Sequence, residues 1–223
     1  IRVHYAAKQI AAETKSPRRP FDKAPEEAPE VDVNSLLREA EVIYGLRFPK
    51  NIIERAPRLK WVQTSSAGID TLLGTKLWQS NVILTNASGI HVVPMREHVI
   101  GLMLTFVRQL DLYCSDKQSR IWKRRLPEQL CGKTLGVVGL GRIGEGIARL
   151  AKAFDMRVVA TRRSATGRET SPVAEALYPP DKLLEMLGEC DFVVVAVALT
   201  DATRKLIGER ELRAMKPSAY IIN

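Results

Sequence analysis

The chain has 223 residues, of which 45% are hydrophobic, and it carries a formal net charge of +9 at pH 7. This length is enough for one large domain or two small ones, and no apolar run approaches the roughly 18 residues of a membrane-spanning helix. The basic residues are scattered or fall in loops, and no aromatic platform accompanies them, which argues against nucleic-acid binding. The positive charge also suits an anionic cofactor or an acid substrate.

Strands and helices alternate through the first half of the chain. We expect strands over 1–5, 42–44, 59–63 and 82–85, a surface loop over 16–30, a short helix capped by Asn34 and ending at Ala40, and another ending at 56–57. The small residues of 65–70 predict a turn into a helix start with exposed N–H groups. A long helix over 93–110 leads into a polar linker over 115–132.

The most informative segment is 135–164. An apolar strand is followed by the G-x-G-x-x-G turn of Gly139, Gly141 and Gly144, an amphipathic helix and a second apolar strand. Gly139 allows a tight turn, Gly141 lets the backbone approach a pyrophosphate, and Gly144 lets the helix pack close to the sheet. The helix that begins near Arg142 points its free N–H groups at that pyrophosphate. The segment predicts a dinucleotide site, and the alternative is a βαβ unit with an incidental glycine turn.

Two arginines stand where an NAD-binding unit usually carries an acid. Arg162 and Arg163 close the second strand of that segment, and Ser164 follows them. A carboxylate there would accept the ribose 2′-OH, whereas guanidinium groups and a hydroxyl favour a 2′-phosphate. We therefore predict that NADP is preferred over NAD. The alternative is a pair of solvated arginines on a loop.

The second half continues the alternation. We expect Asp181 to cap a helix over 182–187, a buried strand over 191–197, a ligand-facing loop over 199–203, a helix over 209–215 and a strand over 220–223. Together the two halves predict an α/β fold with two doubly wound lobes joined by the long helix. The lobes are assigned to residues 1–92 and 93–223.

Several motifs together resemble the D-isomer-specific 2-hydroxyacid dehydrogenase family. They are 66–70 (SAGID), 85–89 (TNASG), Glu97–His98, Trp122, 132–144 (GKTLGVVGLGRIG), 191–203 and 215–223 (MKPSAYIIN). The resemblance implies a flavodoxin-like substrate lobe and a Rossmann NAD(P)-binding lobe. It also implies hydride transfer between NAD(P)H and C2 of a small 2-keto or 2-hydroxy acid, as in a glyoxylate or hydroxypyruvate reductase. A phosphoglycerate or phosphonate dehydrogenase, and a non-catalytic NAD(H)-sensing corepressor-like relative, stay open as alternatives.

The resemblance also assigns binding roles. The backbone N–H groups of Ala67, Gly68 and Ile69 would hold the substrate carboxylate, as a small-residue turn can. The residues expected to contact the cofactor are Gly139, Gly141, Arg142, Ile143, Gly144, Arg162, Arg163, Ser164, Val197, Ala198 and Thr203. Family members normally have proline at the position of Ala198, so a less rigid loop is expected here.

No catalytic residue is expected within these 223 residues. Family members place an arginine three positions after the asparagine that matches Asn223, with a glutamate and a histidine further on. His4, His91 and His98 are interpreted as structural or incidental, since neighbouring Glu97 and His98 would not face one another on a helix. We therefore expect a fragment that is inactive alone.

The three cysteines and the long helix complete the expectations. Cys114, Cys131 and Cys190 stand singly without a C-x-x-C, which is typical of reduced thiols in a cytoplasmic protein and favours neither a disulfide framework nor a metal site. By resemblance, the long helix would form a homodimer.

Overall fold

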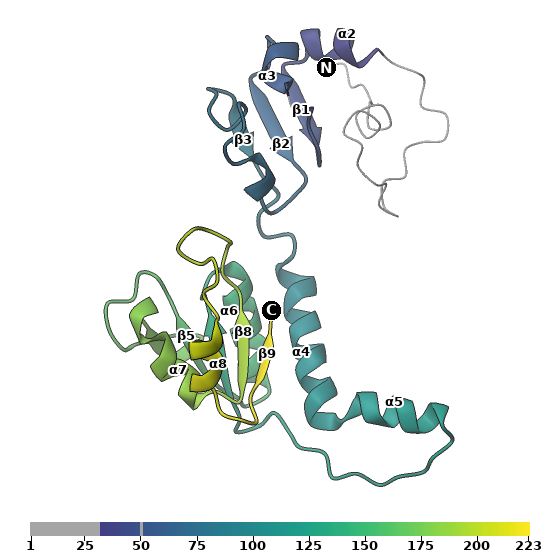
Figure 1. Cartoon of the computed structure of the whole chain (residues 1–223), viewed down its shortest axis with the longest axis vertical. Coiled ribbons are helices and arrows are strands. Elements are labelled where there is room, and N and C mark those ends of the chain that lie inside the picture. Colours follow the sequence, from purple (N-terminus) through teal and green to yellow (C-terminus); the bar gives the residue numbers. More distant parts are fainter. Residues whose placement is uncertain (1–31, 50) are drawn as a thin grey trace. The chain divides into compact units, whose positions relative to one another are not determined.

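The computed structural model describes residues 32–49 and 51–223 (Figure 1). The strand and loop expected over 1–5 and 16–30, and His4, lie outside the described residues. The chain divides into two units, with the boundary between Ile90 and His91.

The first unit is built on a small parallel sheet. Its strands are β1 (Val42–Gly45), β2 (Trp61–Thr64) and β3 (Ile83–Thr85), in that order. The helices are α2 (Val33–Glu39), α3 (Ile52–Arg55) and the single 3₁₀ turn η1 (Asp70–Leu72). Buried apolar side chains from α2, α3 and β2 form the core of this unit. The strands and short helices agree with the sequence prediction to within one or two residues.

The prediction that Asn34 caps α2 is wrong. Asp32 is the N-cap residue, and its carboxylate accepts a hydrogen bond of 3.0 Å from the Asn34 N–H. An N-cap oxygen bonds an N–H two or three residues further on, so Asn34 is already inside the helix. The Asn34 side chain instead accepts from Arg55 Nε at 2.9 Å, which ties α2 to α3.

The second unit begins with α4 (Val92–Arg108), which ends earlier than predicted. Gln109 adopts φ 53°, a left-handed conformation that terminates the helix, and α5 (Leu110–Gln118) starts directly after it. The buried face of α4 consists of Val99, Ile100, Met103 and Val107. Leu110, the last residue of the predicted helix, lies in α5 and is exposed. The sequence did not predict α5, because its last turn is polar.

A six-stranded sheet forms the centre of the second unit, in the order β6-β7-β5-β4-β8-β9. Its strands are β4 (Thr134–Val138), β5 (Arg157–Thr161), β6 (Glu169–Ser171), β7 (Ala174–Tyr178), β8 (Phe192–Val195) and β9 (Tyr220–Ile222). All neighbours are parallel except β6 and β7. Starting from β4, the parallel strands follow the Rossmann order 3-2-1-4-5.

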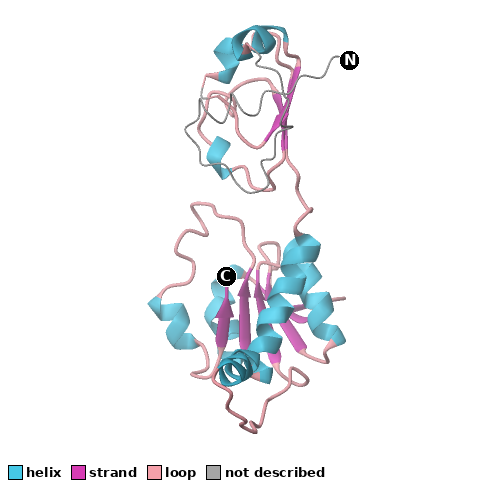
Figure 2. Cartoon of the chain, turned by 90° about the vertical axis from the view of Figure 1, so that its right-hand side faces the viewer, coloured by secondary structure: helices cyan, strands magenta, loops and turns pink. Residues whose placement is uncertain are grey.

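Helices cover both faces of this sheet (Figure 2). They are α4, α6 (Arg142–Ala153), α7 (Leu183–Glu189) and α8 (Glu209–Ala214), with the 3₁₀ turn η2 (Pro180–Lys182) before α7. Every residue of β4 is buried, as expected for a strand covered on both faces. The α/β fold with parallel sheets is thus the one predicted.

Two features around α7 differ from the prediction. Asp181 does not cap this helix: it lies inside η2, which opens on Pro180, and Lys182 is the N-cap residue, with no side-chain cap bond. A proline at the first position of a helical turn supplies the required φ and needs no donor. The hairpin of β6 and β7 was not predicted, since Ala174 and Ala176 carry little strand preference.

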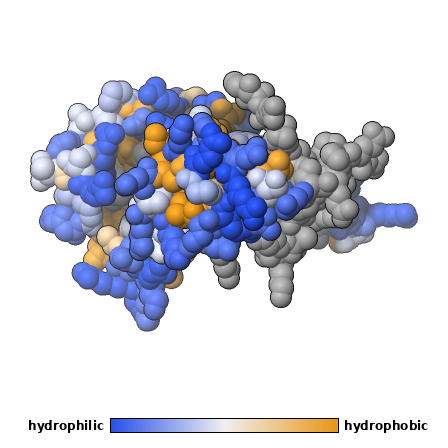
Figure 3. Space-filling view, turned by 90° about the horizontal axis from the view of Figure 1, so that it is seen from above, coloured by the Kyte–Doolittle hydropathy of each residue, from blue (hydrophilic) through white to orange (hydrophobic). Residues whose placement is uncertain are grey.

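Among the described residues, no helix is long and apolar enough to cross a membrane. On the face shown in Figure 3, the described residues are mostly hydrophilic, and the hydrophobic areas among them are small. The mean hydropathy of the chain, −0.10, agrees with this.

Candidate dinucleotide-binding site

The turn between β4 and α6 is shaped by Gly139. This residue has φ 97°, in the left-handed region, where a side chain is strained. A Cβ here would also lie 2.6 Å from Val197 Cγ1 and 3.0 Å from the Ala196 carbonyl oxygen. Glycine is therefore required twice, for the turn itself and for the close approach of the chain after β8.

Gly144 lets α6 pack directly on that turn. A Cβ at Gly144 would collide with the Gly139 carbonyl oxygen and lie 2.9 Å from Val137 Cγ1. The same helix buries Ile147, Ala148 and Ala151 against the core. The start of α6 is thereby fixed close above the end of β4.

Gly141, the middle glycine, lies in open space. It is the N-cap residue of α6, with φ −95° and no side-chain cap bond, and a Cβ there would meet nothing within 4 Å. The first N–H groups of a helix lack partners within the helix and attract anions. Such an open cradle at a helix N-terminus fits the pyrophosphate of a dinucleotide.

Thr161, the last residue of β5, holds the turn in place. The Gly139 N–H donates to Thr161 Oγ1 at 3.1 Å, and the Leu140 N–H donates to the Thr161 carbonyl at 2.9 Å. The Thr161 side chain is buried. Sequence reasoning missed this residue, although a polar side chain closing an otherwise apolar strand beside a glycine turn is a usable signal.

Arg162 comes directly after Thr161, and it is ion-paired. Its Nη2 lies 3.4 Å from Oε1 of Glu145, in the first turn of α6, and the two side chains are 44% and 36% exposed. The Arg162 N–H donates to the Tyr178 carbonyl at 3.1 Å, which fixes the backbone at the end of β5. Arg163 and Ser164 are exposed. The edge of the sheet after β5 thus carries a carboxylate, that of Glu145, which the sequence did not predict.

The third side of the site is the loop after β8. The Ala196 N–H donates to the Val138 carbonyl at 2.8 Å, which holds the loop start against the end of β4. Thr203 Oγ1 donates to the Ala198 carbonyl at 2.6 Å and accepts from the Thr200 N–H at 2.8 Å. These bonds restrain the loop at Ala198, the position where family members normally have proline.

These three segments share one edge of the sheet. The glycine turn comes after β4, residues 162–164 come after β5, and the 196–203 loop comes after β8, and these strands are parallel neighbours. Ligands of open α/β sheets bind at the carboxyl ends of the strands where the order reverses. Here the order reverses between β4 and β8.

The predicted substrate-binding turn belongs to the first unit. Ser66 donates its N–H to Thr64 Oγ1 at 3.1 Å, and Asn86 Nδ2 donates to the Ala67 carbonyl at 2.7 Å. The N–H groups of Ala67, Gly68 and Ile69 donate to no described residue. The turn leads into the single 3₁₀ turn η1, shorter than the predicted helix start, so a helix dipole adds little.

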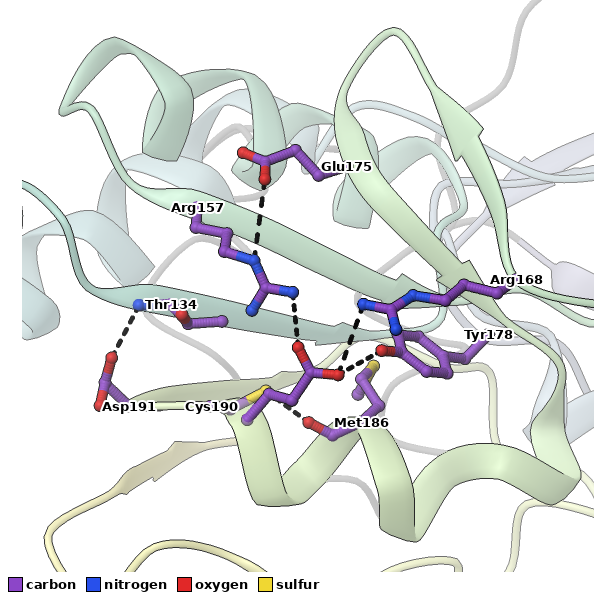
Figure 4. Close-up of polar contacts among 9 residues, drawn as sticks. Thr134, Arg157, Arg168, Glu175, Tyr178, Met186, Cys190 and Asp191 are labelled. Atoms are coloured by element: carbon purple, nitrogen blue, oxygen red, sulfur yellow. Dashed lines mark hydrogen bonds and ion pairs between the residues drawn. The ribbon is translucent and has the colours of Figure 1, made fainter.

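A cluster of charges around the end of α7 supports the fold (Figure 4). The Glu189 carboxylate, at the end of α7, accepts from the Tyr178 hydroxyl and, at 2.5 Å, from Arg157 Nη2, and Arg168 lies 3.7 Å away. Burial would raise the pKa of Glu189, but these donors and positive charges lower it below its usual value. Burial, followed by the bond to Glu189, raises the pKa of Tyr178 to about 12.

Asp191 joins the starts of two neighbouring strands. Its carboxylate accepts from the Thr134 N–H at 2.8 Å and from Lys216 Nζ at 2.8 Å. Burial would raise the pKa of Asp191, and the Lys216 and Thr134 bonds outweigh it, so the pKa lies below its ordinary range. Both ionic groups link elements of the second unit and stabilise its fold.

The described residues hold no cluster of three or more histidine, cysteine or acidic side chains that could bind a metal ion. His91 and His98 are both exposed, at and near the start of α4. Cys114 and Cys131 are exposed and Cys190 is buried, all as free thiols.

Fold and strand order define the second unit as a Rossmann-type domain. Its sequence matches the family described as "D-isomer specific 2-hydroxyacid dehydrogenase, NAD binding domain" over residues 100–223, more than half of the chain. The chain belongs to the D-isomer-specific 2-hydroxyacid dehydrogenase family.

Similar proteins agree with this assignment. A glyoxylate reductase of Pyrococcus furiosus is 33% identical in an alignment of 216 positions, which covers 89% of this chain and 62% of the relative. A D-isomer-specific 2-hydroxyacid dehydrogenase family protein of Aeromonas salmonicida has a similar structure, with TM-score 0.76 and 32% identity over 84% of this chain and 60% of the other.

A D-lactate dehydrogenase of Aquifex aeolicus, solved with NAD and lactic acid, has TM-score 0.70 and 25% identity over 85% of this chain and 58% of the other. The chain therefore spans about three fifths of the length of these similar proteins.

Proposed function

We propose that this chain forms the cofactor-binding and substrate-carboxylate-binding parts of an NAD(P)-dependent oxidoreductase for a small 2-keto or 2-hydroxy acid, of the glyoxylate or hydroxypyruvate reductase kind. Membership of the family supports the reaction class, and the 33% identical glyoxylate reductase supports the substrate class. The observation that carries the proposal is the open cradle at Gly141, set between two tightly packed glycines.

In the proposed site, Gly141 and the backbone N–H groups of Arg142 and Ile143 receive the pyrophosphate at the start of α6. Val197 and Ala198 border the adenosine ribose, and Thr203 keeps their loop in place. When bound, the nicotinamide would supply or accept the hydride at C2 of the acid. The residues of this chain would hold and orient the cofactor.

The proposed cofactor preference is NADP. Arg162 and Arg163 offer guanidinium groups and Ser164 a hydroxyl at the end of β5, and each charge-assisted hydrogen bond to a 2′-phosphate contributes on the order of 1.5–3 kcal/mol. One such bond gives a preference of roughly tenfold to hundredfold. Fluorescence titrations with NADPH and NADH test this: tighter NADPH supports it, and equal affinities or tighter NADH refute it.

The proposed carboxylate site is the turn of Ala67, Gly68 and Ile69. Its support is that these three N–H groups donate to no described residue, while Thr64 and Asn86 fix the turn from both sides. Successive unbonded N–H groups in a turn form an anion-binding nest. Oxalate, a small dicarboxylate, should bind this turn and protect the amides of 67–69 from hydrogen exchange.

Residues 1–223 alone are proposed to bind cofactor without turnover. By family resemblance, the residues that polarise the carbonyl and move the proton come after the position of Asn223, and the exposed His91 and His98 do not replace them. NADPH oxidation with glyoxylate by these 223 residues would contradict this. A longer chain that contains those residues should show activity in the same assay.

A cytoplasmic location is also proposed, because the three free thiols favour it.

Homodimerisation through the long helix is proposed as well. Figure 1 shows α5 and the segment after it extending away from the sheet. That stretch carries exposed apolar side chains, with Trp122 99% exposed, as expected of a surface that a second copy covers. Analytical ultracentrifugation should give a dimer, and Trp122→Ser should weaken it.

A further inference from the structure

Glu145 places a negative charge where the proposed 2′-phosphate site needs positive charge. Its Oε1 lies 3.4 Å from Arg162 Nη2. Glu145 stands in the first turn of α6, and Arg162 comes directly after β5. The pair therefore bridges the glycine turn and the ribose end of the site.

Arg162 and Arg163 are not equivalent in this arrangement. The Arg162 side chain has a carboxylate partner, whereas Arg163 is exposed and makes no ion pair with a described residue. A guanidinium presents its N–H donors in a rigid fork, so an N–H directed at Glu145 is not available to a phosphate. NADH carries a hydroxyl in place of the 2′-phosphate, so its binding does not require this N–H of Arg162.

We infer that Glu145 is a specificity-determining residue that engages Arg162 and so limits the preference of this site for a 2′-phosphate. The inference rests on the proposed NAD(P) site. NADPH must share Arg162 with Glu145 or displace that carboxylate. NADH binds without that cost.

The test uses Glu145→Gln, which keeps the side-chain shape and removes the charge. Because the pair is partly exposed, the dissociation constant for NADPH should fall about two- to fivefold, while that for NADH stays unchanged. Glu209→Gln is the matched control, since it removes the same charge from an exposed ion pair with Arg213 in α8. This control should leave both constants unchanged.

A double-mutant cycle with Arg162→Gln shows whether Glu145 acts through Arg162. In the Arg162→Gln background, Glu145→Gln should no longer change the affinity for NADPH. The inference is overturned if Glu145→Gln tightens NADPH equally in both backgrounds, or tightens NADPH and NADH alike. If the wild-type chain binds neither cofactor, the proposed function fails instead, so the two failures are distinguishable.

Discussion

Alanine substitutions at Gly141 and Gly144 separate the fold of the glycine turn from its proposed use. A Cβ on Gly141 meets nothing within 4 Å, and the residue has an ordinary negative φ. A Cβ on Gly144 collides with the Gly139 carbonyl and comes within 2.9 Å of Val137 Cγ1. The first change fills the space proposed for the pyrophosphate, and the second forces α6 away from β4.

The two free-energy changes should differ clearly. Alanine is a poorer N-cap than glycine by about 0.5–1 kcal/mol. Alanine also lowers the conformational entropy of the unfolded chain, which stabilises the folded state by about 0.4–1 kcal/mol. Gly141→Ala should therefore change the free energy of unfolding very little. Overpacking at Gly144 against backbone should cost about 2–3 kcal/mol. That is a large share of the roughly 5–15 kcal/mol by which a typical domain is stable.

Urea unfolding followed by circular dichroism measures the stability of each variant, and titration with NADPH measures its cofactor affinity. Gly141→Ala should unfold with the wild-type midpoint yet bind NADPH about tenfold or more weakly, because its methyl group occupies the pyrophosphate cradle. Gly144→Ala should lower the unfolding midpoint. Wild-type NADPH affinity in Gly141→Ala, or wild-type stability in Gly144→Ala, would refute the reasoning.

Two further predictions concern the 196–203 loop and the start of the sheet. Thr203→Val removes the hydroxyl that bonds the Ala198 carbonyl, so amide exchange over 198–203 should accelerate and NADPH affinity should fall; unchanged exchange would show that this bond does not hold the loop. Asp191→Asn removes the charge that Lys216 and the Thr134 N–H stabilise, at a cost of about 1 kcal/mol at pH 7. Because the pKa of Asp191 is lowered in the folded state, its contribution is full above the unfolded pKa and is lost as pH falls through the folded pKa. The stability difference between variant and wild type, measured by urea unfolding, should therefore shrink below about pH 4, and a pH-independent difference would argue against the ionic role.

Local patterns predicted the centre of the fold well. Buried strands are indicated by continuous apolar runs, as in β4, β5 and β8. The turn is indicated by the spacing of its glycines, Gly139, Gly141 and Gly144. The same applies to α6, whose buried Ile147 and Ala151 recur at helical spacing.

Features that depend on distant parts of the chain were not predictable in this way. The strand β7 exists because it pairs with β5 and is buried, although alanine and glutamate disfavour strands. The Glu145–Arg162 ion pair joins residues 17 positions apart, and only the packing of α6 beside β5 brings them together. Lys182 replaces Asp181 as the N-cap because Pro180 opens a turn of its own.

The central claim is that the glycine turn and the two neighbouring loops bind a nicotinamide dinucleotide. Hydrogen–deuterium exchange of the 223-residue chain, with and without saturating NADPH, tests it most directly. The account predicts slower exchange at 139–145, 162–164 and 197–203. Unchanged exchange in these three segments, or protection confined to other residues, would contradict it.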